Sequence, residues 1–150
     1  GNPLGQFMMI SNLAICHFNE KRFAKALKTL VGVYIHDGYQ GAAMPFRLRI
    51  AIFELTLRQE VGDFETTERR IDDVRKEFSE LLGTDAQSTE AKLIKLIECM
   101  NESIEVTRDK ELRQKVEHFI ATTPPEELER FSFIDYHDWL KRKIGISVPA

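Results

Sequence analysis

The sequence predicts an all-α protein, a single domain (1–150) of seven or eight helices. Apolar residues recur at helical spacing along almost the whole chain, and no alternating stretch is bounded by hairpin signals. A length of 150 residues suits one domain with a substantial core. Because the links between the first apolar segments are short, we expect antiparallel helical hairpins.

The first two helices are predicted over residues 4–18 and 22–35. Only three polar residues separate them, Asn19-Glu20-Lys21, and so short a link forces an antiparallel pair. Small alanines should let the two helices approach closely, with larger side chains filling the seam. The residues expected in this seam are Ile10, Leu13, Ala14, His17, Phe23, Ala26 and Leu30.

A third helix is predicted to start near Pro45 and to end at Val61. Proline suits the first turn of a helix because it loses no hydrogen bond there. The apolar residues of this segment spread around most of the helix circumference, so the helix must be covered on several sides. We therefore expect it to lie centrally, between the first pair and the helices that follow.

Three further helices are predicted between residues 64 and 120. The fourth follows the Gly62-Asp63 turn, and the fifth and sixth start near Ser88 and Asp109. The fourth helix shows one apolar face opposite a charged face. Its expected buried residues are Phe64, Ile71, Val74, Phe78 and Leu81.

The end of the chain is predicted to form a short helix up to residue 131 and a closing helix. Thr123-Pro124-Pro125-Glu126 combines a helix breaker with a start signal. Ser132 with Asp135 can cap the closing helix, and Gly145 matches its end. Trp139 lies beside the apolar stripe of this helix, so we expect it to close the open end of the core.

The residue order around the first two helices resembles that of a tetratricopeptide (TPR) repeat. Leu13-Ala14 and the later Phe23 and Ala26 match the repeat, whereas Lys21 stands where it usually has glycine. Gly62-Asp63-Phe64 is similar to a second copy of the turn and its aromatic residue. The resemblance implies antiparallel hairpins stacked as a TPR-like α-α superhelix.

The resemblance is best over residues 1–82 and departs from the family in its period. Phe23 and Phe64 are 41 positions apart (64 − 23), against about 34 in this repeat, which places the extra residues within 32–44. Residues 88–146 are expected to add helices and a C-terminal capping helix. The ending is similar to the last helix of bacterial TPR-like proteins of unassigned function. Because an apolar helix starts almost at Gly1, we expect the C-terminal part of a longer protein.

Composition and motifs argue against several functional classes. A net charge of −3 disfavours nucleic acid and anionic membranes as partners, and we expect a cytoplasmic protein. Cys16 and Cys99 form neither a disulfide framework nor a metal motif. The chain lacks phosphate-binding glycine loops, a nucleophile elbow and a zinc-binding helix motif. We therefore expect no enzyme, no metal and no cofactor.

The TPR resemblance implies a protein-interaction scaffold that holds a partner segment in a helical groove. If the seam predicted above is right, five residues of the first helix face away from it, and Arg49 falls near the same side, where some TPR proteins hold a partner's carboxylate. The expected partner-binding residues are Met8, Ser11, Asn12, Ile15, Asn19 and Arg49.

Two alternatives stay open. Further helices of the full protein can cover the predicted groove, in which case the domain is an intramolecular regulatory or capping module of a signalling or DNA-binding protein. The third possibility, an enzyme with a distributed site, requires a deep pocket with convergent titratable groups.

Overall fold

The computed structural model describes residues 3–83, 88–129 and 133–146. Within these residues it contains ten α-helices, two short 3-10 helices and no strand, so the all-α prediction is confirmed. The number of helices exceeds the predicted seven or eight, because the single turns α3 and α6 were not expected. The elements are α1 (Pro3–Asn19), α2 (Phe23–Val31), η1 (Gly32–Ile35), α3 (Asp37–Gln40), α4 (Met44–Val61), α5 (Phe64–Glu77), α6 (Ser79–Leu82), α7 (Thr89–Glu102), η2 (Val106–Arg108), α8 (Lys110–Thr122), α9 (Pro125–Glu129) and α10 (Tyr136–Lys143).

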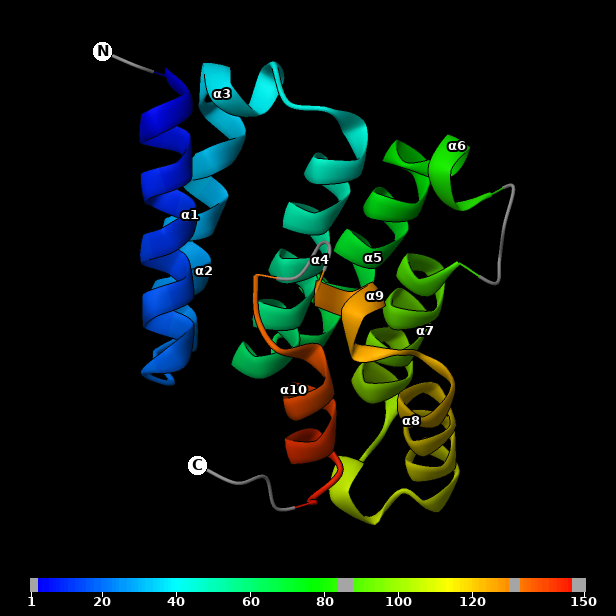
Figure 1. The fold of residues 1–150 in the computed structure, drawn as a ribbon. Coiled ribbons are helices and arrows are strands. Elements are labelled where there is room, and N and C mark those ends of the chain that lie inside the picture. Colours follow the sequence, from blue (N-terminus) through cyan, green and yellow to red (C-terminus); the bar gives the residue numbers. More distant parts are fainter. Residues whose placement is uncertain (1–2, 84–87, 130–132, 147–150) are drawn as a thin grey trace.

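The longer helices form a row in chain order. Helices α1 and α2 lie side by side and run in opposite directions (Figure 1), as their short connection predicts. Contacts then lead from α2 to α4, from α4 to α5 and α7, and from α7 to α8. Near the C-terminus, α10 lies beside the last turns of α4, where the buried hydroxyls of Thr56 and Tyr136 are 3.2 Å apart.

Helix α4 is the centre of the molecule, as its apolar circumference predicts. Every residue from Ile50 to Leu57 is buried. The helix ends at Gly62, whose φ of +88° is a left-handed conformation that glycine adopts at little cost. Asp63 then caps α5 by accepting a hydrogen bond from the Thr66 amide, so the chain reverses within two residues.

A row of six phenylalanine rings connects the first helices to the C-terminal segment. Neighbouring ring centroids are 5.5 to 5.9 Å apart. Such ring pairs add about 0.5–1.5 kcal/mol beyond the area that they bury. In order of contact, the row consists of Phe7, Phe46, Phe133, Phe53, Phe18 and Phe23. Phe133 thus contacts two rings of α4 and attaches the segment before α10 to the first half of the chain.

The orientation predicted for the first helix is wrong in part: Ala14 is buried and Ile10 and His17 are half-buried as expected, but Leu13 and Ser11 are not where predicted. Leu13, expected in the seam, is 49% exposed, whereas Ser11, expected at the surface, is 1% exposed. The Phe7 ring is buried and contacts Phe46, which turns this side of α1 inward. Ser11 tolerates burial because its hydroxyl donates a 3.0 Å hydrogen bond to the Phe7 carbonyl. Ala14 is fully buried as predicted.

The predicted fourth helix is interrupted. It divides at Phe78 into α5 and the single turn α6, and this break directs Leu82 rather than Leu81 toward the interior. Phe64, expected to be buried, is 56% exposed because it occupies the first position after the cap, at the edge of the fold. Ile71, Val74 and Phe78 are buried as predicted.

Three predicted helix starts are confirmed by their N-caps. The side chains of Ser88, Asp109 and Asp135 each accept a backbone hydrogen bond from the residue three positions later. Ser132, the other residue assigned to the last cap, lies outside the described residues. Trp139 is buried as predicted. Its helix covers the side of α4 rather than an open end of the row, because Trp139 and Tyr136 both bond to α4.

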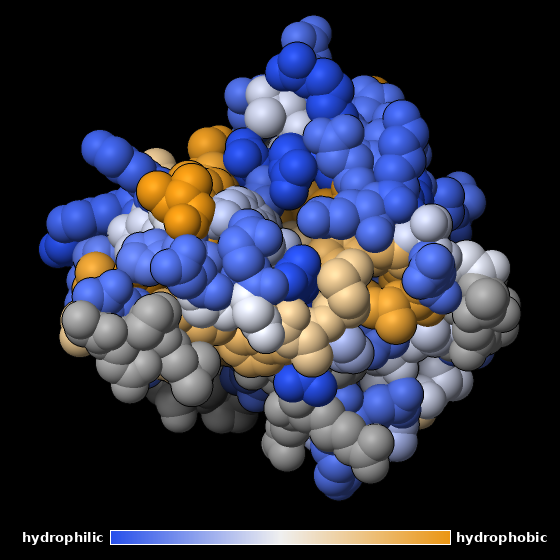
Figure 2. Space-filling model, turned by 90° about the horizontal axis from the view of Figure 1, so that it is seen from above, coloured by the Kyte–Doolittle hydropathy of each residue, from blue (hydrophilic) through white to orange (hydrophobic). Residues whose placement is uncertain are grey.

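The described part of the chain contains no helix that combines the length and apolarity needed to cross a bilayer. Seen from the end that is uppermost in Figure 1, hydrophobic side chains form a broken band between hydrophilic ones (Figure 2). Ile35 and Met44, in elements at this end, are among the exposed apolar residues. Because hydrophilic residues interrupt the band, it is not one continuous apolar surface.

Candidate functional site

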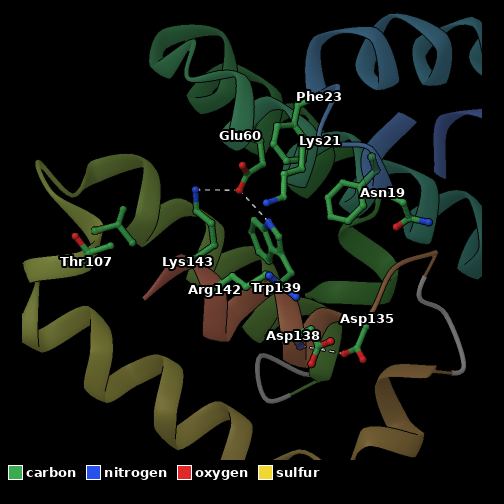
Figure 3. Close-up of a pocket in the computed structure, with 12 residues that line it drawn as sticks. Asn19, Lys21, Phe23, Glu60, Thr107, Asp135, Asp138, Trp139, Arg142 and Lys143 are labelled. Atoms are coloured by element: carbon green, nitrogen blue, oxygen red, sulfur yellow. Dashed lines mark hydrogen bonds and ion pairs between the residues drawn. The ribbon is translucent and has the colours of Figure 1, made fainter. Parts of the chain in front are cut away.

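A cleft of about 700 Å³, which we call the Trp139 cleft, lies beside the single tryptophan of the chain. Four segments that are distant in the sequence surround it: the turn between α1 and α2, the end of α4, η2 and α10 (Figure 3). The packing of α10 on α4 therefore creates the cleft. Its lining residues are Phe18, Asn19, Lys21, Phe23, Glu60, Val106, Thr107, Asp135, Asp138, Trp139, Arg142 and Lys143.

One carboxylate holds α10 at the edge of the cleft. The Trp139 indole N–H donates a 3.0 Å hydrogen bond to Glu60 Oε1, and Lys143 Nζ lies 3.0 Å from the same oxygen (Figure 3). Charge-assisted hydrogen bonds of this kind are stronger than neutral ones. We call the set Glu60, Trp139 and Lys143 the Glu60 latch. Trp139 is the only tryptophan of the chain, so its fluorescence reports on this cleft.

Lys21 enters the cleft from a strained backbone. Its φ of +62° is the only positive value among the described residues other than glycine. The turn is held by hydrogen bonds from the Lys21 amide to Phe18 and from the Arg22 amide to His17, each 2.9 Å. A left-handed conformation costs a residue with a Cβ about 1–2 kcal/mol, and glycine avoids this cost. The Lys21 side chain points toward Trp139 (Figure 3).

The remaining groups give the cleft both apolar walls and unpaired positive charge. Phe18 and Phe23 are half-buried, and their rings meet edge to face. Within the described residues, neither Lys21 nor Arg142 forms an ion pair with a carboxylate. On the opposite margin, the Asp135 carboxylate accepts a hydrogen bond from the Asp138 backbone amide and so caps α10. The cleft thus holds two cations without an ion pair and two aromatic rings, together with the carboxylates of Asp135 and Asp138 at its margin.

A second polar cluster lies on another side of α4. The Glu54 side chain is 1% exposed and accepts hydrogen bonds from Tyr34 at 2.5 Å and Arg58 at 2.5 Å. Arg70 of α5 donates two more, each 2.8 Å. Tyr34, Glu54, Arg58 and Arg70 form what we call the Glu54 cluster. A hollow of about 460 Å³ adjoins it, but both Glu54 oxygens are already bonded, so the cluster joins η1, α4 and α5 rather than offering a free carboxylate.

The surroundings of Glu54 determine its charge state. Burial is the largest single influence and raises the pKa of Glu54, but the hydrogen bonds from Arg70, Tyr34 and Arg58 together outweigh it and hold that pKa below its usual range. Burial, followed by the negative charge of Glu54, raises the pKa of the Tyr34 phenol. Tyr34 therefore stays a protonated donor and Glu54 an ionised acceptor at neutral pH.

The residues predicted to bind a partner do not share one surface. Met8 and Asn12 are exposed, but Ser11 is buried and Ile15 is half-buried against the core. Asn19 lines the Trp139 cleft. On α4, Arg49 is half-buried. The prediction of Ser11 as a surface residue is wrong for the reason given above, and a binding role for the other five residues stays a prediction.

Sequence reasoning missed Lys21, Arg142 and Trp139 as neighbours in one cleft. The only signal for this site was Lys21 in the place where the resembled repeat has glycine, which now coincides with a left-handed backbone. In the described residues, no three histidine, cysteine or acidic side chains gather as a metal site. The chain matches no family model, no curated protein and no solved structure in comparisons with known proteins.

Proposed function

We propose that the chain is a non-enzymatic, cytoplasmic interaction scaffold that binds a segment of a partner protein in the Trp139 cleft. The architecture proposed for it is a TPR-like stack of the hairpins α1–α2, α4–α5 and α7–α8. Contacts within each hairpin and between α2 and α4, α4 and α7, and α5 and α7 support this stacking. Such stacks provide concave surfaces that bind extended or helical peptides.

The observation that carries the proposal is the strained lysine at the mouth of the cleft. A lysine in the left-handed region lowers stability relative to a residue without strain, and strained positions concentrate at functional sites. This lysine places an ammonium group in the cleft, and no carboxylate of the described residues lies within ion-pair distance of it. A binding role would account for a lysine where glycine would hold the same turn at a lower cost.

The chemistry of the cleft selects the kind of segment that it takes. Lys21 and Arg142 suit an acidic side chain, and Phe18 and Phe23 suit a neighbouring aromatic or aliphatic one. A volume of about 700 Å³ accommodates a few residues rather than a whole domain. We therefore propose an extended partner segment in which a carboxylate lies next to an apolar side chain.

The test is selection from a random peptide library on the immobilised protein, followed by titration of synthetic peptides while the fluorescence of Trp139 is recorded. The proposal predicts a shared acidic-apolar pattern and a fluorescence change on binding. In the Lys21→Glu/Arg142→Glu variant the affinity for these peptides should fall at least tenfold. The control Lys25→Glu/Lys28→Glu makes the same change in net charge at exposed positions of α2 and should keep the affinity of the parent. Peptides that bind equally to both variants would contradict the proposal.

A single substitution separates the binding role of Lys21 from its structural effect. Lys21→Gly relieves the left-handed strain, so its free energy of unfolding should equal or exceed that of the parent by up to about 1 kcal/mol. Its affinity for the selected peptides should nevertheless fall. If Lys21→Gly unfolds more easily and binds as well as the parent, Lys21 has no role in the cleft.

A second candidate function rests on the outer side of α1. Met9 is 69% exposed and Leu13 49%, on consecutive turns, and Cys16 is exposed one turn further. Apolar residues in this pattern favour packing against another domain of the same protein. A thiol reagent tests this, because Cys16 should react more slowly if a further domain of the same protein covers this surface than in residues 1–150 alone. Equal rates would leave this surface without a covering domain.

A further inference from the structure

A second surface, distinct from the Trp139 cleft, lies over α7. Two adjoining hollows of about 300 and 370 Å³ both include Ala91 and Lys95 of this helix. One lies between α7 and α8, and the other between α7 and the segment of α5 and α6. We call the two hollows together the α7 surface. No residue lines both the α7 surface and the Trp139 cleft, so this surface is independent of the function proposed above.

The α7 surface is positively charged although the chain carries a net charge of −3. None of its described lining residues is acidic, and its basic residues are Arg75, Lys92, Lys95, Lys115 and His118. Two neighbouring carboxylates reduce this charge in part. Glu98 lies 2.5 Å from Arg75 and 2.9 Å from Lys95, and Glu111 lies 3.5 Å from Lys115. Among the described residues, three of the four lysine and arginine side chains thus form ion pairs, and they share two carboxylates.

Two of the basic groups have no acidic neighbour of this kind. Lys92 is half-buried and His118 is exposed, and within the described residues neither forms an ion pair. Both border the hollow between α7 and α8. The positive charge of Lys92, which has no ion-pair partner among the described residues, therefore lies beside that hollow.

Apolar side chains form the floor of both hollows. Leu96 and Phe119 lie beneath the first, and Leu82 and Ile94 beneath the second. Between the hollows, the side chain of Ala91 is small enough to let the backbone of a second helix approach closely. An apolar floor with a basic margin is complementary to a helix that has leucine-like residues on one face and carboxylates beside them.

We propose that the α7 surface binds an acidic amphipathic helix of a partner protein. The apolar side chains of that helix would lie in the two hollows, and its carboxylates would pair with Lys92, Lys115 and their neighbours. Nucleic acid fits less well, because phosphate recognition uses cations but leaves the apolar floor without a partner.

The groove between α7 and α8 also indicates where along its length the carboxylates of the bound helix lie. Beyond Lys115 it continues into a hollow of about 190 Å³ bordered by Glu102, Asp109 and Glu111. Acidic side chains of the partner are favoured over the first turns of α7 and disfavoured over its last turn. The acidic residues of the partner therefore lie over the part of the groove between Lys92 and Lys115, away from Glu102 and Asp109.

The test uses a synthetic helix of about 18 residues, roughly 27 Å long, with leucines on one face and glutamates on both sides of them. The first control peptide has the same composition in scrambled order, and the second has lysines in place of the glutamates. Binding is measured by fluorescence anisotropy of a labelled peptide. Only the acidic amphipathic peptide should bind, and Trp139 fluorescence should not change. Equal binding of the scrambled peptide would overturn the proposal.

Two variants of the protein locate the binding. Lys92→Glu/Lys115→Glu should raise the Kd for the acidic peptide at least tenfold. Lys25→Glu/Lys28→Glu has the same net charge and should leave this Kd unchanged. Ala91→Arg fills the space between the hollows but adds a positive charge. The proposal predicts weaker binding in this variant, with the circular dichroism of the parent. Tighter binding of the peptide by Ala91→Arg, or tighter binding of a DNA duplex than of the acidic peptide, would overturn the proposal. Binding would then depend on positive charge alone and not on the apolar hollows.

Discussion

Helix α4 carries two glutamates, Glu54 and Glu60, that stabilise different parts of the molecule. They are six residues apart and thus about 120° apart around the helix axis. Glu54 contacts η1 and α5, whereas Glu60 contacts only α10 among the hydrogen bonds and ion pairs of the described residues. The Glu54 side chain is 1% exposed and that of Glu60 is 15% exposed.

This difference separates the framework from the wall of the cleft. Both Glu54 oxygens accept hydrogen bonds, and their donors come from three elements of the first half of the chain. At Glu60 a single oxygen receives both contacts, and both come from one short helix. We infer that loss of Glu54 weakens the whole fold, whereas loss of Glu60 releases α10 and opens the Trp139 cleft.

The largest expected effect is that of Glu54→Gln. This change leaves Arg58 and Arg70 without a buried carboxylate, and breaking such a buried pair costs about 3–5 kcal/mol. Urea unfolding followed by circular dichroism measures it. Glu77→Gln is the matched control, because Glu77 borders the same hollow but is exposed, and it should change stability by less than about 0.5 kcal/mol. Similar losses in both variants would contradict the role assigned to Glu54.

Acid should remove part of the same stabilisation. Because the pKa of Glu54 is lowered on folding, its ionisation stabilises the folded state fully above the ordinary carboxyl pKa of 4.5, and this contribution is lost as the pH falls through the lower pKa of the folded state. The difference in unfolding free energy between the parent and Glu54→Gln should be constant near neutral pH and shrink below about pH 4.5. A difference that grows in acid would show the opposite sign of the pKa shift.

Glu60→Leu is expected to have a smaller effect. The Trp139 indole and the Lys143 ammonium lose their shared acceptor, at a cost of about 1.5–3 kcal/mol for bonds to a charged group. Trp139 fluorescence should change in the folded protein, because water gains access to the indole. Glu54→Gln should leave the folded-state fluorescence unchanged. An unaltered spectrum in Glu60→Leu would mean that α10 stays in place without the Glu60 latch.

The smallest effect is expected for Lys143→Met. This variant keeps the Trp139 hydrogen bond and removes only a partly exposed ion pair, worth about 0.2–1 kcal/mol. Thermal unfolding at low and high salt measures it, and salt should reduce the difference from the parent. A loss as large as that of Glu60→Leu would place the strength of the latch in Lys143 rather than in Trp139.

Much of the fold could be predicted because it depends on local patterns. The spread of apolar residues placed α4 at the centre, and the three helix starts predicted near Ser88, Asp109 and Asp135 are correct. The orientation of α1 could not be predicted in this way. It depends on Phe7 reaching Phe46 across the fold and on Ser11 satisfying its hydroxyl within its own helix.

The candidate site was harder to predict because it is assembled from distant segments. Lys21 and Trp139 are 118 positions apart (139 − 21), and no periodicity brings them together. Glu54 likewise finds Arg70 only because the Gly62-Asp63 turn folds α5 back on α4. The sequence did show one departure from the TPR pattern at this site, which is Lys21 in a position where the repeat usually has glycine. Its left-handed backbone explains why a lysine is unusual there.

Native-state hydrogen exchange, followed by mass spectrometry, tests most directly the claim that Glu54 stabilises the framework and Glu60 only the wall of the cleft. In Glu60→Leu we predict faster exchange in α10 and unchanged exchange in α4 and α5, and in Glu54→Gln faster exchange in α4 and α5. Acceleration of α4 and α5 in Glu60→Leu to the same degree as α10 would contradict the account, because α10 would then be part of the framework.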